Sequence, residues 1–198
     1  MDHTDHYPVS CAFCEISTAY PPDPSSPVPH NPDPNATDPS CFLLLSTDHV
    51  LAFLDILPIS PGHILLTTRQ HYRTLADLDT ADNATQTAAE LGRYLPILSR
   101  ALRKATGIED WNVVQNNGAR AAQVVPHVHF HLIPRYQEGR LEAGRKGHVD
   151  VGMLKSWRMF GRGAREDLDE EEAQEMARRL RGTLGEELQR SKASGSKL

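Results

Sequence analysis

His127-Val128-His129-Phe130-His131-Leu132-Ile133 alternates three histidines with apolar residues. Because successive side chains of a β-strand point to opposite faces, the pattern predicts a strand with the histidines on one face and the apolar residues directed into the core. A row of imidazoles about 7 Å apart is costly to bury unless each ring has a partner. A lone histidine is often a structural residue, whereas three in strict alternation indicate a functional site.

Two kinds of chemistry use such a histidine row. Three neutral imidazoles can bind a metal, as in sites like that of carbonic anhydrase. Alternatively, one imidazole can attack phosphorus while its neighbours orient it and handle the proton. Residues 115–123, Gln-Asn-Asn-Gly-Ala-Arg-Ala-Ala-Gln, form a small, amide-rich loop before the row, and its backbone N–H groups are suited to phosphate oxygens. This context favours phosphate chemistry.

Periodicity elsewhere in the chain predicts an α+β fold around this strand. Short apolar runs between turn residues predict further strands at 42–46, 50–54, 63–68 and 111–115. We therefore expect a mainly antiparallel sheet of about five strands, with one long helix across it and a second helix near the C-terminus. The long helix is expected to begin near Thr80 and to end at Gly107, and its leucines at helical spacing are Leu91, Leu95, Leu98 and Leu102.

The chain divides by composition into five segments. Eight of its fourteen prolines lie between positions 21 and 39, which predicts an irregular, mobile insertion loop; the alternative is a proline motif that binds a partner. The C-terminal helix is charged, has an apolar stripe, and is expected to be capped by Asp169 and Glu172. The segments are the N-terminal cysteine segment 1–20, the proline-rich insertion 21–40, the core 41–136, the C-terminal extension 137–190 and a flexible tail 191–198.

Composition and charge exclude several classes of protein. The chain has 198 residues, of which 39% are hydrophobic and 24% charged, ordinary values for one globular domain. Its net charge of -5 gives no general attraction to nucleic acid or to anionic membranes, so phosphate binding is expected to be local. No apolar run is long enough to span a bilayer, and the N-terminus lacks the apolar region of a secretory signal. We expect neither nucleic acid nor a membrane as a partner.

The histidine row and its surroundings resemble the histidine-triad (HIT) family. The signature runs from Asn116-Asn117-Gly118 to Pro134-Arg135, and it is preceded in the same order by four motifs. The likeness covers most of residues 11–136, is closest to the Hint-like branch of fungal adenosine 5'-monophosphoramidases, and implies a HIT-like fold. It does not account for the insertion or for the chain from about Gln137 onward. The four motifs are Cys11-Ala12-Phe13-Cys14-Glu15-Ile16, Phe53-Leu54-Asp55-Ile56, Ser60-Pro61-Gly62-His63 and His71-Tyr72.

The resemblance implies a covalent mechanism. The middle histidine, His129, would attack the α-phosphorus of an adenine nucleotide and form a nucleotidyl-imidazole that water then hydrolyses. His131 would contact the phosphate and help to protonate the leaving group. His63 would orient His129, and so would His127, through its backbone or its ring.

The resemblance also implies the nucleotide-binding residues. Asp55 would accept hydrogen bonds from the ribose hydroxyls, and Ile56 would pack near the base. Asn116 and Gln123 would hold the α-phosphate region.

Two residues depart from the family pattern. The family usually has glycine where this chain has Ala122, and a hydroxyl residue where it has Val124. The second change removes one side-chain donor to the phosphate or leaving group, worth about 1–3 kcal/mol of transition-state stabilisation. The backbone donors of the loop survive both changes.

Three functions fit the resemblance. The first is hydrolysis of AMP-amine adducts (phosphoramidates) to AMP and amine, which the Asn-Asn-Gly loop and the cysteine pair favour. The alternative is a Fhit-like hydrolase that cleaves the P–O–P link of dinucleoside polyphosphates such as Ap3A or Ap4A. A nucleotide-binding scaffold with residual activity is the third. Deadenylation of nucleic-acid ends is a weaker option, because no basic groove is evident.

Cys11 and Cys14 have the C-x2-C spacing of a thiolate half-site for zinc. With three cysteines in all, a disulfide framework is not expected. The alternatives are two ordinary buried cysteines or a redox pair, and the redox role is disfavoured because the pair does not open a helix after a strand. The resemblance implies that His71 and His127 complete the set. Two sulfurs and two nitrogens would make a closed, structural Zn²⁺ site that takes no part in the chemistry.

The last three residues, Ser196-Lys197-Leu198, match the peroxisomal import signal that a receptor reads on an exposed tail. They predict the peroxisome as the location, with cytoplasm and nucleus as the alternatives. The family resemblance implies, in addition, a homodimer formed by the long helix and an edge strand.

Overall fold

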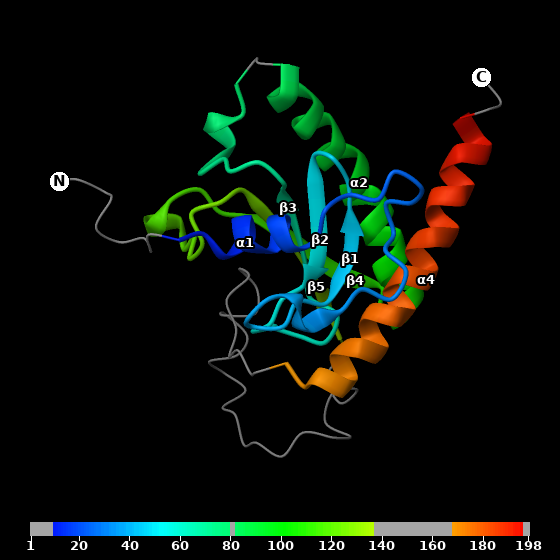
Figure 1. Cartoon of the computed structure of the whole chain (residues 1–198). Helices are drawn as coiled ribbons and strands as arrows, with labels where there is room; N and C mark the ends of the chain where they lie inside the picture. The colour runs from blue at the N-terminus through cyan, green and yellow to red at the C-terminus, as the bar shows by residue number, and fades with distance from the viewer. Residues whose placement is uncertain (1–9, 80–81, 137–167, 196–198) are drawn as a thin grey trace.

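Figure 1 shows a computed structural model in which one antiparallel sheet packs against two long helices. The structure describes residues 10–79, 82–136 and 168–195. The start of the predicted C-terminal extension (137–167) and the C-terminal tripeptide (196–198) lie outside the described residues.

The sheet has five strands in the order β1-β2-β3-β5-β4, and every neighbouring pair is antiparallel. The predicted α+β fold is therefore confirmed, with strand bounds that differ from the expected ones by at most two residues. The strand with the histidine row begins at His129 rather than His127, so His127 lies just before it. The strands are β1 (Leu43–Ser46), β2 (Val50–Leu54), β3 (Ile64–Thr68), β4 (Asp110–Gln115) and β5 (His129–Arg135).

The predicted long helix is α2 (Asp82–Thr106), and it lies across one face of the sheet. Of its four leucines at helical spacing, Leu95 is partly buried and the other three are buried in the main core. Gly107 ends the helix as predicted: its φ is 68°, and its N–H donates to the Arg103 carbonyl at 2.8 Å.

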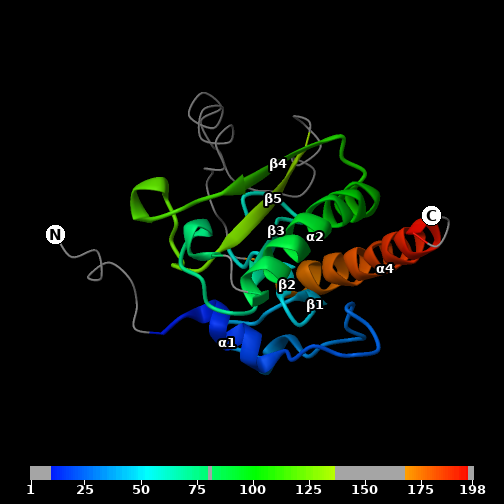
Figure 2. The same cartoon turned by 90° about the horizontal axis from the view of Figure 1, so that it is seen from above.

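The C-terminal helix α4 (Glu170–Gly195) packs beside α2 (Figure 2). Its predicted cap is confirmed, because the Glu172 N–H donates to Asp169 Oδ1 at 2.9 Å. The helix continues to Gly195, into the segment predicted as a flexible tail, because each residue added to a formed helix gains a backbone hydrogen bond. Most of the predicted apolar stripe is buried, namely Ala173, Ala177, Leu180 and Leu184, with Met176 partly buried.

A buried carboxylate ties α4 to α2. The Glu187 side chain is fully buried; its Oε2 accepts from Arg100 Nε at 2.5 Å and its Oε1 forms an ion pair with Lys104 Nζ at 2.6 Å, both cations lying on α2. Arg190 Nη2 of α4 lies 3.0 Å away. The hydrogen bond from Lys104, with those of its neighbouring cations, holds the pKa of Glu187 below its ordinary value.

The other face of the sheet is covered by α1 (Ala12–Ala19), a short helix that the sequence analysis did not predict. Residues 21–40 follow it along the β1 edge of the sheet (Figure 2), and one 3-10 turn at Pro34–Ala36 is their single regular element. The segment is therefore irregular, as its prolines predict, while its mobility and its status as an insertion stay predictions. Across the described ranges, none of the helices combines the length and apolar content that a bilayer crossing needs.

Candidate active site and metal centre

The histidine row lies on the sheet face that α1 covers. His129 and His131 line a cavity of about 290 Å³, whereas His127 is not in its lining and lies against Cys11 and Cys14. The ring of Phe13 packs edge-on against both His127 and His129, with centroids 5.8 and 5.2 Å away. The expected alternation holds, because Val128 is fully buried on the opposite, helix-covered face.

The hydrogen bond of His129 fixes its tautomer. Its Nδ1 lies 2.7 Å from the carbonyl oxygen of His127. A carbonyl can only accept a hydrogen bond, so Nδ1 carries the proton and Nε2 is the unprotonated nitrogen of the neutral ring. The side chain is 4% exposed and lines the cavity. This is the state that a nucleophilic imidazole requires.

His131 is linked to a second buried histidine. Its Nδ1 lies 3.0 Å from His63 Nε2, and Asp55 Oδ2 lies 3.4 Å from His63 Nδ1 and 4.0 Å from His131 Nδ1. The three donor groups would also fit a cation by distance, but the direct hydrogen bond between the rings accounts for their spacing without one. His131 is held by His63 at its Nδ1 and lines the cavity, so its Nε2 is the nitrogen placed to exchange a proton with a leaving group.

The position of His63 connects it to the nucleophile through His131. The sequence analysis expected His63 to orient His129. The rings of His63 and His131 lie 5.1 Å apart, and those of His131 and His129 lie 4.9 Å apart. His127 orients His129 through its carbonyl, as the resemblance implied.

A row of paired residues crosses four strands, and three of its members form the floor of the cavity. The register pairs Leu43 with Phe53, Phe53 with Leu65, and Leu65 with His131. Phe53, Leu65 and His131 all line the cavity, and α1 contributes Phe13 to its lining. The result is an apolar slot with the imidazoles of His129 and His131 at one end, a shape suited to a nucleobase with its phosphate at the histidines.

The loop before the histidine row is held together by Gln123. This side chain is 2% exposed, accepts from the Gly118 N–H at 2.7 Å, and donates to the carbonyls of Arg73 at 2.6 Å and His127 at 3.3 Å. Neither Gln123 nor Asn116 is among the residues that line the cavity, whereas the other expected nucleotide-binding residues, Asp55 and Ile56, are. Gln123 therefore shapes the loop in this structure, and any phosphate contact from the loop falls to its backbone.

The two residues that depart from the family pattern have visible consequences. Ala122 has φ 63°, a left-handed conformation that favours the glycine usual at this position. Val124 is 80% exposed and lines the cavity, so an apolar side chain stands where the family has a hydroxyl.

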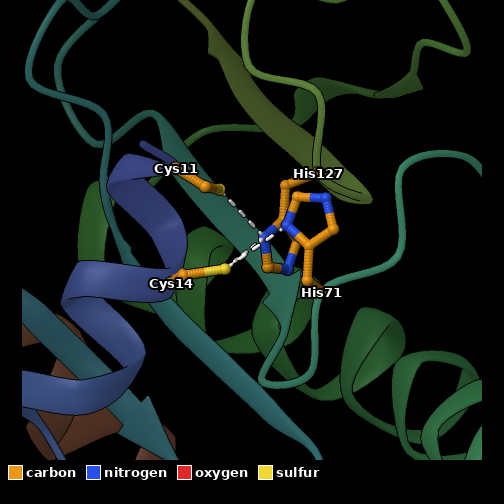
Figure 3. Close-up of side chains that lie close together, drawn as sticks. All are labelled: Cys11, Cys14, His71 and His127. Atoms are coloured by element: carbon orange, nitrogen blue, oxygen red, sulfur yellow. Dashed lines mark hydrogen bonds between the residues drawn. The ribbon is translucent and has the colours of Figure 1, made fainter. Parts of the chain in front are cut away.

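The four predicted metal ligands are brought together from three segments of the chain (Figure 3). Cys11 precedes α1 and Cys14 lies in its first turn, while His71 follows β3 and His127 precedes β5. The ligand atoms all lie within 4.8 Å of one another. Cys11 Sγ is 3.3 Å from His127 Nδ1, and Cys14 Sγ is 3.3 Å from His71 Nδ1 and 3.7 Å from His127 Nδ1.

These distances fit a tetrahedral zinc ion. With bonds of about 2.3 Å to sulfur and about 2.05 Å to nitrogen, the sulfur and nitrogen ligands of zinc lie about 3.6 Å apart. His127 Nε2 is 2.8 Å from the Thr68 carbonyl, so Nε2 carries the proton and the Nδ1 lone pair faces the sulfurs. Burial lowers the pKa of His127 to about 4, and the ring is therefore neutral, as a metal ligand must be.

The cysteine pair opens α1, but no strand precedes this helix in the described residues, and the electrostatics of the pair are not those of a redox pair. Burial, followed by the neighbouring Cys11, raises the pKa of Cys14 to about 11. Reactive cysteines have a lowered pKa. A cation at this position would reverse the effect and make the thiolates favourable.

The fold and the arrangement of histidines at the site are those of the histidine-triad class of proteins. The HIT domain matches residues 37–138, and the chain belongs to the HIT family.

Comparison with individual proteins agrees with this assignment. The chain is 35% identical over 130 residues to adenosine 5'-monophosphoramidase of Schizosaccharomyces pombe, a match that covers 66% of this chain and 77% of that protein. It is 38% identical over 103 residues to adenylylsulfatase of Arabidopsis thaliana, where the match covers 52% of this chain and only 50% of the relative. A zinc-bound histidine triad family protein from Mycobacterium smegmatis has the same fold, with a TM-score of 0.57, 24% identity, and coverage of 89% of this chain and 94% of that one.

Two features of the site could not be read from the sequence motifs. Thr68, whose carbonyl orients the ring of His127, belongs to no recognised motif. Residues 37–40 line the same cavity as His129, although they belong to none of the short motifs recognised in the sequence.

Proposed function

We propose that this chain hydrolyses adenosine 5'-phosphoramidates, cleaving the P–N bond of an AMP-amine adduct through a nucleotidyl-histidine intermediate. The observation that carries the proposal is His129, whose Nδ1–H is held by the His127 carbonyl while Nε2 keeps a lone pair in a ring that lines the cavity. The S. pombe relative, which bears the name of this activity, supports it.

The reaction has two steps. First, Nε2 of His129 attacks the α-phosphorus, the P–N bond breaks, and the amine leaves with a proton from His131. Then water attacks the same phosphorus, the bond to His129 breaks, and the water proton passes to the pair of His131 and His63. The products are AMP and a free amine, and the enzyme returns to its starting protonation state.

The cavity suggests how the nucleotide is placed. The base would rest on the apolar floor of Phe53 and Leu65, next to Ile56, with the α-phosphorus at the histidines. Asp55 lines the same cavity and would accept from the ribose hydroxyls, as the resemblance implies. Backbone N–H groups of the loop that Gln123 braces would face the phosphate oxygens.

Intact-mass spectrometry during turnover of AMP-lysine tests the mechanism. Wild type should carry a covalent AMP, and His129→Ala should carry none and lose hydrolysis. His30→Ala, an exposed histidine of the insertion, is the matched control and should behave as wild type. Full hydrolysis by His129→Ala would show that the nucleophile is wrong.

The same assay ranks the other candidate functions. Faster turnover of diadenosine triphosphate than of AMP-lysine would favour a Fhit-like dinucleoside polyphosphate hydrolase. Tight AMP binding with no hydrolysis of either compound would favour a nucleotide-binding scaffold.

We further propose that Cys11, Cys14, His71 and His127 hold a structural Zn²⁺. Four converging N and S donors at tetrahedral spacing support this assignment. The ion would tie α1 to the strand that carries the nucleophile. Metal analysis of the purified protein should find about one zinc per chain, lost in Cys14→Ser and kept in Cys41→Ala, because Cys41 lies in the apolar cluster and outside the ligand set. Zinc-free wild type would refute the assignment.

Two proposals concern assembly and location. We propose a homodimer through α2 and the edge strand β4, where Val113 is 46% exposed. Val113→Arg should then lower the mass found by light scattering, and a monomeric wild type would refute the dimer.

We also propose peroxisomal import through Ser196-Lys197-Leu198. An N-terminal fluorescent fusion should enter peroxisomes and become diffuse when the tripeptide is removed; a diffuse full-length fusion would contradict import.

A further inference from the structure

The proline-rich insertion forms part of the nucleotide cavity. Residues 37–40 line it together with His129 and His131. They lead directly into β1, which is separated from β5 by β2 and β3. At a strand spacing of roughly 4.8 Å, β1 and β5 lie about 14 Å apart. The insertion therefore lines the end of the cavity that is remote from the nucleophile.

That remote end is where a nucleobase would lie. With the α-phosphorus at His129 and His131, the floor of Phe53 and Leu65 leads from the histidines toward Leu43 and β1. An apolar floor binds any base by its flat surface, so discrimination between bases depends on polar groups at the far edge of the slot.

The far wall is held firmly in place. The hydroxyl of Tyr20, a residue 6% exposed, lies 2.7 Å from the Asp33 carbonyl and 3.3 Å from those of Pro34 and Cys41. The Cys41 N–H donates to the Pro34 carbonyl at 2.8 Å. The one proton of the Tyr20 hydroxyl goes to the Asp33 carbonyl, its shortest contact, and the bond between Cys41 and Pro34 closes the segment that contains residues 37–40, so the wall is held in this form without a ligand.

The polar side chains of this wall differ in what they can offer a ligand. The Thr37 hydroxyl donates to the Pro39 carbonyl at 2.9 Å, and the Ser40 hydroxyl donates to Asn35 Oδ1 at 3.0 Å. Asp38 is exposed, lines the cavity, and makes no hydrogen bond or ion pair with any residue of the described ranges. An ionised carboxylate is an acceptor only, so it pairs with N–H groups and not with a carbonyl.

We propose that Asp38 makes this cavity selective for nucleobases that carry an exocyclic amino group, by accepting a hydrogen bond from that group. The inference rests on the proposed nucleotide function of the site and adds its base preference. Adenine offers its 6-amino group, and guanine offers its 2-amino group with the adjacent N1–H. Hypoxanthine has no amino group: it presents a carbonyl in place of the adenine amine, and it keeps only the N1–H of the two adjacent donors of guanine. Hydrogen bonds to charged groups are stronger than those between neutral groups. A nucleobase that leaves the carboxylate without a donor should therefore bind less tightly.

Calorimetric binding of AMP, GMP and IMP to the full-length protein tests the selectivity without any need for turnover. We expect wild type to bind AMP or GMP about tenfold more tightly than IMP. The ratio should fall close to one in Asp38→Ala, and Asp38→Asn should gain affinity for IMP, because its amide can donate to the carbonyl. Asp23→Asn removes the same charge from the same insertion but outside the cavity, and it should keep the wild-type ratio.

A second carboxylate in the cavity lining provides a further test of the proposal. Glu15 lies on α1 and is also exposed. Selectivity lost in Glu15→Gln but kept in Asp38→Ala would overturn the proposal, and so would equal binding of AMP and IMP by wild type. The comparison of AMP binding with GMP binding shows whether Asp38 accepts from the 6-amino group of adenine or from the 2-amino group of guanine. Selective binding without hydrolysis of any phosphoramidate would leave this inference standing while the proposed reaction fails.

Discussion

Replacing Gln123 with alanine should destabilise the loop that precedes the histidine row. The side-chain amide bonds three backbone groups, of Gly118, Arg73 and His127, at 2.7, 2.6 and 3.3 Å. A buried group left without a partner costs about 1–3 kcal/mol. Because Gly118 and Arg73 are only partly buried, water replaces some of the lost bonding there. We expect the free energy of unfolding to fall by about 2 kcal/mol.

Urea unfolding and steady-state kinetics of the same samples show whether Gln123 stabilises the loop or contacts the substrate. The His127 carbonyl also holds Nδ1 of His129, so kcat should fall while KM changes little. Gln123→Glu keeps the size of the side chain but replaces its donor with an acceptor, and it should be at least as destabilising as alanine. An unchanged unfolding midpoint together with a raised KM would refute the bracing role and would mean that Gln123 contacts the substrate phosphate.

Three other substitutions test the packing around the site. Glu187→Gln should cost about 2 kcal/mol at neutral pH, since its cationic partners are partly exposed. The pKa of Glu187 is lowered in the fold, so its contribution exists above the unfolded pKa of about 4.3 and is lost as pH falls through the folded value; urea unfolding near pH 7 and near pH 3 should show the difference shrink in acid. Ala122→Gly should raise the stability by about 1 kcal/mol, seen as a higher melting temperature, because φ is 63° there. Gly62→Ala should cost about 2 kcal/mol and reduce activity through the adjacent His63, since φ is 82° and a Cβ would lie 3.3 Å from Thr106 Cγ2; unchanged unfolding would contradict this packing.

Much of the fold could be predicted because each element has its own pattern of apolar residues or its own capping residue in the sequence. The five strands have the alternation or apolar runs of their type, and the two long helices have full apolar stripes. The end of α2 at Gly107 and the cap of α4 at Asp169 depend on single residues whose backbone or side-chain chemistry is specific. The helix α1 has eight residues, too few for a helical period to stand out, and it forms because Phe13 packs against the sheet.

The candidate site was predictable in its residues but not in its geometry. The alternating histidines and the C-x2-C pair could be recognised from spacing alone. Which nitrogen of His129 carries the proton depends on the carbonyl of His127, and a backbone group leaves no trace in a motif. The contact between His63 and His131 and the place of residues 37–40 in the cavity depend on tertiary packing, which joins segments far apart in the chain.

His127 connects the two halves of this site. Its ring belongs to the cysteine and histidine cluster, while its carbonyl fixes the tautomer of His129. An ion bound to Nδ1 of His127 would hold the ring, and the Thr68 carbonyl would hold the opposite nitrogen. The ring of His127 would then be held at both nitrogens, and with it the backbone whose carbonyl accepts from His129 Nδ1. The ion would therefore affect catalysis only by positioning this carbonyl. Loss of the ion should therefore reduce kcat more than it changes the affinity for AMP, because Phe53, Leu65 and Asp55, the residues proposed to hold the base and the ribose, are not ligands of the ion.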